Sequence, residues 1–448
     1  MKAKKLMSLI MAGALLVGAL AGCGGSGSSS STASEESKTS STAETSGTAE
    51  TAKSDAKLTI WVYGWEKASA DKIQEDTAKY KEETGVEVTV VPIASDSYST
   101  KIQATLAGGN NPDLAFVDAG VQSIQLAAKG KLLPLKEYGV EEYKDKFYDS
   151  VWDTMTYKDD VYGLRITSNN LALFYNKEKF ANANLEEPTA DWTWDDLRSA
   201  AKALTDPDNN AYGLDLPIYD KNGGYTWTWL PFLWQNGGKM LNDDRTEAIF
   251  NSPEAVEALE FWKTMVQEDK SVPLQAAPTG VNRFSSGITG MCIDGPWMLS
   301  VYLSDPNFKD KFGVAPLPQK KQQATVVGGE GVVVFSNTKY PQEAYDYLVH
   351  LTCSEFVQTF WENWITIPPQ PEFKDFYAGD DLYGDYIQVF SDQMEYSQTR
   401  QFTPSWPQIE NTLGIDLQAY MFDKEDDVQA ALDKAVADVN KILAEEVE

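Results

Sequence analysis

Segments with the character of strands and of helices alternate over residues 58–118, and this order constrains the fold more than any other feature of the chain. The strand-like segments are rich in β-branched and aromatic residues, and those between them have the periodicity of amphipathic helices. Successive strands joined through a helix lie parallel in one sheet. The sequence therefore predicts an α/β fold, whose ligands bind beyond the carboxyl ends of the strands. The predicted strands are 58–63, 86–91 and 113–117, and the predicted helices are 67–83 and 97–108.

The same alternation continues through the rest of the chain. Thr193 and Asp196 have the spacing of a capping box, and Pro253 after Ser252 is typical of the first turn of a helix. At 448 residues the chain is longer than one hydrophobic core usually organises, so we expect two lobes. Further strands are predicted at 171–175, 312–315 and 332–335, and further helices at 193–204, 253–267, 341–352 and 425–446.

The chain is strongly acidic, with 38 Lys and Arg against 67 Asp and Glu and a formal net charge of −29. A field of this sign disfavours binding to nucleic acid or to anionic lipid, so we expect no nucleic-acid partner. One histidine and three cysteines are too few for a Cys/His zinc site or a disulfide scaffold. We therefore expect no metal and no cofactor, and we favour free thiols over a disulfide for Cys292 and Cys353.

Residues 1–22 have the composition of an export signal. Lysines near the start precede an apolar stretch over residues 6–20, and small residues follow. Residues 20–23, Leu-Ala-Gly-Cys, resemble the lipobox of bacterial lipoproteins, in which cleavage falls before the cysteine and the cysteine then carries lipid. We expect a lipoprotein anchored through Cys23 to the extracytoplasmic face of the cell membrane. An ordinary secretory signal with an incidental cysteine is the alternative.

Residues 23–57 are predicted to be the lipidated cysteine and a disordered tether. Residues 24–57 are almost all Gly, Ser, Thr, Ala, Glu, Asp and Lys, and they include no aromatic side chain. Such a segment cannot bury enough apolar surface to offset its loss of chain entropy. We expect it to act as a flexible linker on the outer face of the membrane.

Tryptophans are concentrated in segments predicted to be loops, turns and helix ends. Exposed apolar rings are unfavourable, so these residues either pack the lobes or line a cleft. In a cleft, a flat ring can stack on the apolar face of a sugar while carboxylates and amides bond its hydroxyl groups. The carboxylates of Glu66, Asp118 and Asp294 suit that role. The tryptophans are Trp227, Trp229, Trp234, Trp297, Trp361, Trp364 and Trp406.

Seven short sequence phrases follow one another after the tether. They are 106–113 (Leu-Ala-Gly-Gly-Asn-Asn-Pro-Asp), 162–164 (Tyr-Gly-Leu), 173–177 (Leu-Phe-Tyr-Asn-Lys), 193–197 (Thr-Trp-Asp-Asp-Leu), 234–238 (Trp-Gln-Asn-Gly-Gly), 290–297 (Gly-Met-Cys-Ile-Asp-Gly-Pro-Trp) and 328–331 (Gly-Gly-Glu-Gly). In their order and spacing they resemble the extracellular solute-binding proteins of ABC importers, solute-binding family 1. That group takes oligosaccharides and related polyols and includes the maltose-binding protein. The phrases are specific to the family and not to one substrate.

This resemblance implies an α/β, two-lobed fold of the periplasmic-binding-protein type (class II), with a ligand cleft between lobes joined by several hinge crossings. A ligand that bridges both lobes would stabilise a closed form by hinge rotation, and the membrane permease would recognise that form. We expect crossings near 165–167, near 313–316 and after about 352. The implied lobes are 58–165 plus 313–352 (lobe 1) and 166–312 plus 353–448 (lobe 2).

The resemblance also implies ligand-binding residues, one position at a time. Tyr98 follows the second strand, where the family often places a tyrosine that contacts sugar, and Asn169 matches a polar ligand residue of relatives. Trp297 matches a stacking tryptophan of the maltose-binding protein, and Gly329 fits a backbone contact. The full expected set is Trp65, Glu66, Tyr98, Asp118, Asn169, Trp227, Trp229, Asp294, Trp297, Gly329, Glu330, Trp364, Arg400 and Trp406.

These features predict a monomeric binding protein, not an enzyme, that takes an extracellular sugar, expected to be an oligosaccharide, and delivers it to an ABC permease. Two alternatives stay open. The same fold could bind another polar solute, such as a glycerol phosphodiester or a polyamine, and a phosphate would then use Arg165, Arg283 or Arg400. The chain could also be a secreted glycoside hydrolase, although no motif places two carboxylates in acid and base roles.

Overall fold

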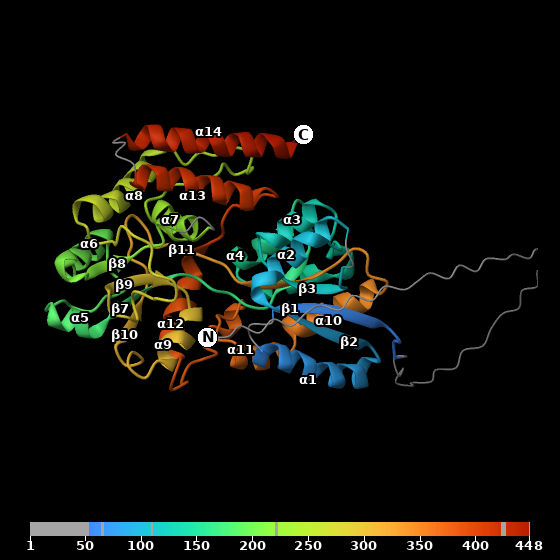
Figure 1. The fold of residues 1–448 in the computed structure, drawn as a ribbon. Coiled ribbons are helices and arrows are strands. Elements are labelled where there is room, and N and C mark those ends of the chain that lie inside the picture. The colour runs from blue at the N-terminus through green and yellow to red at the C-terminus, as the bar shows by residue number, and fades with distance from the viewer. Residues whose placement is uncertain (1–52, 64–66, 109–110, 220–222, 423–426, 448) are drawn as a thin grey trace, which may run out of the picture. The chain divides into compact units, whose positions relative to one another are not determined.

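Two β-sheets organise the described part of the chain in this computed structural model (Figure 1). The structure describes residues 53–448 apart from 64–66, 109–110, 220–222, 423–426 and 448. The predicted export signal, Cys23, nearly all of the tether, Trp65 and Glu66 lie outside the described residues. Residues just before 58 already belong to the fold, because Ala56 is buried and the Ser54 hydroxyl donates to a Glu343 carboxylate oxygen at 2.9 Å.

The first sheet has the strand order β2-β1-β3-β12-β6. Strands β1, β2 and β3 pair in parallel, which confirms the arrangement predicted from the alternation of strands and helices. Strand β12 comes from far along the chain and pairs antiparallel with both β3 and β6. The strands are β1 Lys57–Tyr63, β2 Glu87–Ile93, β3 Leu114–Asp118, β6 Gly163–Arg165 and β12 Glu330–Val334, and a small hairpin is formed by β4 Thr156–Tyr157 and β5 Asp160–Val161. The helices of this part are α1 Lys67–Thr84, α2 Ser95–Leu106, α3 Gln122–Ala128, α4 Asp149–Trp152, α10 Pro341–Cys353 and α11 Phe356–Asn363.

The second sheet has the order β10-β7-β9-β8. Strands β8 and β9 are parallel, and β7 runs antiparallel to β9 and to β10. Its strands are β7 Ala172–Asn176, β8 Tyr212–Asp215, β9 Thr289–Asp294 and β10 Phe312–Ala315, and the short strands β11 Thr325–Val326 and β13 Ser397–Gln398 pair with each other. The helices of this part are α5 Lys177–Asn182, α6 Trp194–Ala203, α7 Gly224–Gln235, α8 Pro253–Lys263, α9 Trp297–Ser304, α12 Gly384–Gln393, α13 Trp406–Phe422 and α14 Val428–Val447.

Local sequence signals explain where two of these helices begin. The Thr193 hydroxyl accepts from the backbone N–H of Asp196, and the Asp196 carboxylate accepts from the backbone N–H of Thr193 at 2.9 Å. This reciprocal pair is the predicted capping box of α6. Helix α8 has Pro253 in its first turn, as predicted, and it continues into a single π-helical turn at Thr264–Glu268.

Three segments connect the two sheets, and they lie side by side. The first follows β6, the second precedes β12 and the third follows α11. Asn169 in the first segment bridges to Gly328 in the second, and Ser168 bridges to Ile367 in the third. We call residues 166–169, 327–329 and 365–367 the hinge segments. The first is therefore held between the other two by backbone hydrogen bonds.

The second and third crossings lie later in the chain than we expected. We placed 313–352 in lobe 1, yet β10 pairs with β7 in the second sheet. The chain rejoins the first sheet only between Val326 and Glu330. Helix α11 packs on α1 and α10, although we placed 353–448 in lobe 2, and α12 is the next helix to contact β10. Long-range strand pairing fixes both boundaries, and no local sequence signal marks it.

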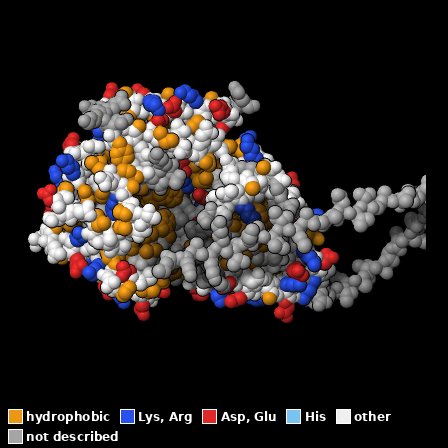
Figure 2. Space-filling view, in the orientation of Figure 1, with side chains coloured by type: hydrophobic (Ala, Val, Ile, Leu, Met, Phe, Trp, Pro, Cys, Tyr) orange, Lys and Arg blue, Asp and Glu red, His pale blue; other side chains and the backbone are white. Residues whose placement is uncertain are grey.

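The core is rich in buried aromatic rings. Trp194, Trp229, Trp262, Trp361 and Trp406 are among its largest fully buried side chains. The Trp361 indole donates to the Ile166 carbonyl at 2.7 Å, so it holds the backbone of a hinge segment. Figure 2 shows charged side chains on the outside of the molecule and hydrophobic side chains around a hollow, where Figure 1 has α7 and α9.

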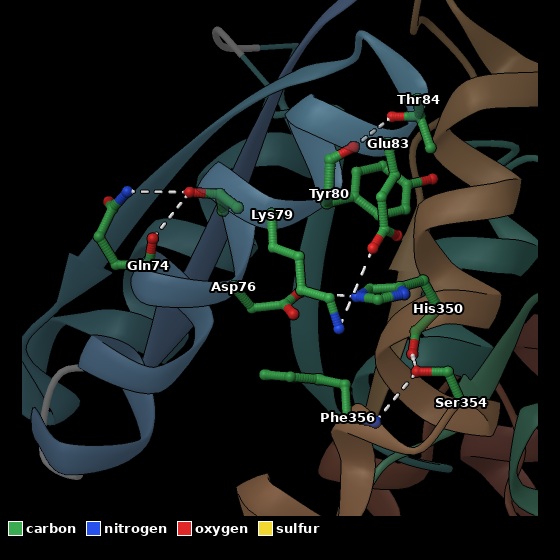
Figure 3. A network of polar contacts seen from close by, with 10 residues as sticks. Gln74, Asp76, Lys79, Tyr80, Glu83, Thr84, His350, Ser354 and Phe356 are labelled. Carbon is green, nitrogen blue, oxygen red and sulfur yellow. Dashed lines mark hydrogen bonds and ion pairs between the residues drawn. The ribbon is translucent and has the colours of Figure 1, made fainter.

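His350 joins two helices of the first lobe (Figure 3). It lies on α10, and its Nε2 is 2.6 Å from Oδ2 of Asp76 on α1. The rings of Tyr80 and Phe356 pack against the imidazole, with centroids 4.7 and 5.7 Å away. His350 therefore packs within the fold. No helix in the described residues combines the length and the hydropathy needed to cross a membrane.

Substituting His350→Ala should lower the melting temperature by a few degrees, because a hydrogen bond to a charged group contributes about 1.5–3 kcal/mol. Differential scanning calorimetry measures this. Lys79→Ala is the control, since the exposed Lys79–Glu83 pair on the same helix spans 4.0 Å and such pairs contribute about 0–1 kcal/mol. Equal decreases in melting temperature for the two variants would contradict a stabilising role for the His350–Asp76 hydrogen bond.

Candidate ligand-binding cleft

Acidic side chains lie at strand ends in both sheets. Asp118 ends β3, and the register of the first sheet places Glu330 of β12 beside it. Asp215 and Asp294 end the parallel strands β8 and β9 of the second sheet. Carboxyl ends of parallel strands are where α/β folds bind ligands, and Glu330 reaches the same edge as the first residue of antiparallel β12. These four carboxylates therefore mark the candidate site.

A cavity of about 660 Å³ is lined by Asp118 and Glu330 of the first sheet and by residues of the second lobe, such as Trp227 and Trp297. We call it the tryptophan cleft. Its volume falls within the range of about 300–1,000 Å³ typical of small-molecule sites. Eight residues of the set predicted from the sequence line it, namely Asp118, Asn169, Trp227, Trp297, Gly329, Glu330, Trp364 and Arg400.

Three tryptophans give the cleft apolar walls. Trp297 is 41% exposed, which is unusual for so large a ring, and Trp227 and Trp364 are half-buried. The Trp227 ring lies against a hinge segment, because a Cβ at Gly328 would meet a ring carbon at 2.2 Å. Only glycine allows this approach.

Arg400 packs against the ring of Trp227. Its Cζ lies 4.3 Å from the ring centroid of Trp227, and its Nη1 donates to Oε1 of Glu410 at 2.9 Å. Burial raises the pKa of the Glu410 carboxyl, although the positive charge of Arg400 acts in the opposite direction. Two buried polar atoms at the cleft have no hydrogen-bond partner among the described residues, and these are Asn169 Oδ1 and Arg400 Nε.

Asp118 and Glu330 are hydrogen-bond acceptors on the wall formed by the first lobe. Burial raises the pKa of Glu330 to about 6, and the neighbouring Asp118 charge adds to the rise. A hydrogen bond from the Thr167 hydroxyl opposes it. Burial also raises the pKa of Asp118 against the opposing charges of Arg400 and Arg165.

Arg165 is 1% exposed, and its side chain bonds to the hinge segments. Its guanidinium donates to Thr154 Oγ1 at 2.8 Å, to the Thr167 carbonyl at 3.0 Å and to the Gly328 carbonyl. Burial lowers its pKa to about 10, so the group stays charged at neutral pH. Its donors are committed to two hinge segments and not to a ligand.

A second cavity, of about 500 Å³, adjoins the cleft on the side of the second lobe. We call it the inner chamber. It shares Gly224, Trp227 and Trp297 with the tryptophan cleft. Asp294, another residue of the predicted set, lines this chamber and not the cleft. Asp215 and Arg283 also line it, and the Arg283 Nη1 donates to Asp215 Oδ1 at 3.0 Å.

Three predicted ligand residues lie in the core instead. Tyr98, Trp229 and Trp406 are each 0% exposed and line neither cavity. The Tyr98 hydroxyl lies 2.8 Å from the Phe116 carbonyl oxygen and 3.1 Å from that of Trp61, so its one O–H donates between two strands. Trp229 lies two positions after Trp227 on α7, which turns it to the opposite side of the helix. Trp406 packs edge-on against Phe402, with ring centroids 5.4 Å apart.

Some residues of the two cavities were missed by the sequence reasoning. Asp215 could have been found, because it ends a predictable strand beside Asp294. Glu410 lies inside helix α13 and carries no such signal. Cys292, which lines the inner chamber, and Cys353 are both free thiols, as we favoured. Within the described ranges, no cluster of His, Cys, Asp and Glu is arranged to hold a metal ion.

A two-lobed α/β fold with a cleft of aromatic rings and hydrogen-bonding groups is that of a solute-binding protein. The family model of the bacterial extracellular solute-binding proteins matches residues 64–355, and the chain belongs to this family.

Individual proteins support the same assignment. A Brucella abortus protein, named for binding without a stated ligand, is 26% identical over 81% of this chain and 87% of its own length. The cyclic α-maltosyl-1,6-maltose binding protein of Arthrobacter globiformis has a similar structure, with a TM-score of 0.76 and 26% identity over 87% of this chain and 99% of its own. An ABC substrate-binding protein of Listeria monocytogenes, solved with cycloalternan, has a TM-score of 0.75 and the same identity and coverage. These likenesses confirm the predicted fold class.

The pKa of Asp294 predicts a pH-dependent stability. Burial, with Asp215 nearby, raises this pKa to about 7 from an ordinary value of 3.8. Between these values the folded state binds a proton that the unfolded state has released, so stability falls as pH rises from about 4 to about 7. Asp294→Asn should therefore raise the melting temperature more at pH 8 than at pH 4, measured by thermal unfolding in matched buffers.

Asp243→Asn is the control for this experiment. Asp243 is exposed and its pKa lies below the ordinary value because Lys239 donates to it. Its substitution should bring no gain at pH 8. If Asp294→Asn changed the melting temperature equally at both pH values, the burial of this charge would not be what limits stability.

Proposed function

We propose that this protein binds an extracellular sugar, an oligosaccharide, in the tryptophan cleft and delivers it to an ABC permease. The observation that carries the proposal is the pairing of exposed Trp297 and half-buried Trp227 with the carboxylates of Asp118 and Glu330 around one cavity. Aromatic faces suit the apolar faces of sugar rings, and carboxylate oxygens accept from hydroxyl groups. Two of the relatives described above support the same class of cargo. One is named for binding cyclic α-maltosyl-1,6-maltose, and the other was solved in complex with cycloalternan.

The three arginines considered for a phosphate-bearing cargo are all engaged in part, and only Arg400 keeps a buried donor, its Nε, without a partner among the described residues. Arg400 pairs with Glu410, Arg283 pairs with Asp215, and Arg165 donates to hinge carbonyls. A phosphodiester needs several free cationic or N–H donors. Carboxylates alone do not make a glycosidase, and we assign them to hydrogen bonding and not to catalysis.

The location of the protein is the second part of the proposal. We infer that the chain is exported, cleaved before Cys23 and held on the extracytoplasmic face of the membrane by lipid on that cysteine. The lipobox pattern supports this inference, as does the extracellular character of the family. We further infer that the protein acts as a monomer, in which the lobes close over the sugar.

Trp227→Ala should weaken sugar binding by about tenfold or more, because a central aromatic anchor is lost. Isothermal titration calorimetry with maltotriose, arabinotriose, lactose, glycerophosphocholine and spermidine would measure it. Tyr143→Ala, on a ring that lines neither cavity, is the control and should keep wild-type affinity. Binding of only the phosphodiester or the polyamine would replace the sugar as cargo, and hydrolysis of a bound glycan on long incubation would overturn the assignment as a binding protein.

Cys23→Ala should abolish lipid attachment. Triton X-114 partitioning of protein expressed in a bacterium should place the wild type in the detergent phase, and mass spectrometry should find lipid on an N-terminal peptide that begins at residue 23. Cys353→Ala should partition like the wild type, because Cys353 lies within the folded part. A mature N-terminus elsewhere, without lipid, would show an ordinary secretory signal.

A further inference from the structure

One contact between the two lobes lies outside the hinge segments and outside both cavities. The ring of Phe402, in the second lobe, is seated on the backbone of Gly120, in the first. We propose that Phe402 is a positioning residue for ligand binding, because its contact with Gly120 sets how closely Asp118 lies to Arg400 across the tryptophan cleft. The inference rests on the proposed sugar-binding function and goes further by assigning a residue that controls affinity without touching the ligand.

Position 120 has room only for a residue without a side chain. A Cβ there would meet three ring carbons of Phe402 at 2.0, 2.3 and 2.4 Å, whereas carbon atoms in contact are about 3.5–4.0 Å apart. Gly120 also has a φ of +86°, which glycine adopts at little cost. The contact therefore depends on the missing side chain, and any larger residue would push the ring away.

Both sides of the contact are held in place. The backbone N–H of Gly120 donates to the Ser123 hydroxyl at 2.8 Å, and that hydroxyl donates to the Thr154 carbonyl at 2.9 Å. Phe402 is 3% exposed, and Arg245 donates to its carbonyl at 3.2 Å. A ring enclosed in this way does not swing aside easily, so a displacement at Gly120 is passed on to the second lobe.

Each partner of the contact is two residues away from a residue of the cleft. Asp118 precedes Gly120, Arg400 precedes Phe402, and both charged residues line the tryptophan cleft. The Arg400 guanidinium also packs on the Phe402 ring, with Cζ 4.7 Å from the ring centroid. Gly120 and Phe402 themselves line neither cavity. The contact thus fixes the spacing between an acceptor of one lobe and a cation of the other.

Apolar residues at the start of α3 extend the same contact. Ile124 is 1% exposed and is buried in the hydrophobic cluster of the second lobe, against which Val121 also packs, although both follow β3 of the first sheet. The lobes are therefore joined here by side-chain packing and not by a crossing of the chain. Such an interface can separate while the backbone hydrogen bonds between the hinge segments stay intact.

Gly120→Ala tests the contact, and Gly139→Ala is its matched control. Gly139 lies in the first lobe with a φ of +89°, but a Cβ there would meet no atom within 4 Å. Both substitutions strain the backbone alike, and only the first displaces Phe402. Each is made in the wild type and in a Phe402→Ala background. Calorimetric titration of the purified full-length chain with maltotriose, arabinotriose and lactose measures affinity, and melting curves verify folding.

Gly120→Ala should weaken the tightest sugar complex by about tenfold in the wild type but by less than about threefold in the Phe402→Ala background, where the ring is absent. Gly139→Ala should change the affinity by less than about twofold in either background. Equal losses for the two alanines, or equal losses for Gly120→Ala in both backgrounds, would refute the positioning role while sugar binding stood. If Gly120→Ala does not fold, Phe402→Leu carries the test, and unchanged affinity in that variant would be the refuting result.

The distance between the lobes provides a second readout, which needs no ligand. Spin labels on p-acetylphenylalanine introduced at Lys79 of α1 and Lys441 of α14, whose side chains are each 74% exposed, report this distance by double electron–electron resonance. Gly120→Ala, or Phe402→Leu in its place, should shift the distance distribution, and Gly139→Ala should not. An unshifted distribution would overturn the proposal even if the wild type bound no sugar, a result that by itself would overturn the proposed function.

Discussion

The buried guanidinium of Arg165 is the interaction on which the arrangement of the two lobes depends. A charge with so little exposure is tolerated only when its donors are satisfied, because an unpaired buried ion costs several kcal/mol. Here the partners are carbonyls of two different hinge segments and a hydroxyl of the first lobe. The group therefore fixes the segments relative to each other at the point where the chain leaves one sheet for the other.

The hinge and the ligand site are built from the same residues. Asn169 and Gly329 line the tryptophan cleft and belong to hinge segments, and Thr167 of the first segment donates to Glu330. A ligand that bonds to Glu330 or Asn169 thus touches the connection between the lobes directly. If the lobes close around such a ligand, as we propose, the closure would be a shift between two states of these segments, driven by contacts that both lobes make only when they are closed.

Local sequence signals predicted several of the strands and helices, and the family resemblance implied much of the cleft lining, but long-range contacts decided the rest. The strands of the first sheet and the capping box of α6 were predictable, because periodicity and capping are local properties. Asp118 was predictable because it follows a predicted strand, whereas Asp294 was proposed as a loop carboxylate suited to sugar hydroxyl groups. Burial of Tyr98, Trp229 and Trp406 was not, since α7 is apolar on nearly all sides and its sequence does not tell which ring faces the cavity. The crossings lie later in the chain than predicted because β10 and β12 pair with strands that are far away in the sequence.

The inner chamber, unlike the hinge, is lined by segments of the second lobe alone. Its walls come from the end of β8, the segment around 276–284 and the beginnings of α7 and α9, all within the second lobe. None of these contributes a hinge segment or a partner of Arg165. The chamber meets the hinge at Trp227, whose ring lines the chamber and lies against Gly328, whereas its other walls can vary without replacing a hinge residue. Substitutions in those walls would change the shape of the chamber while the hydrogen bonds of Arg165 to the hinge segments stay as they are.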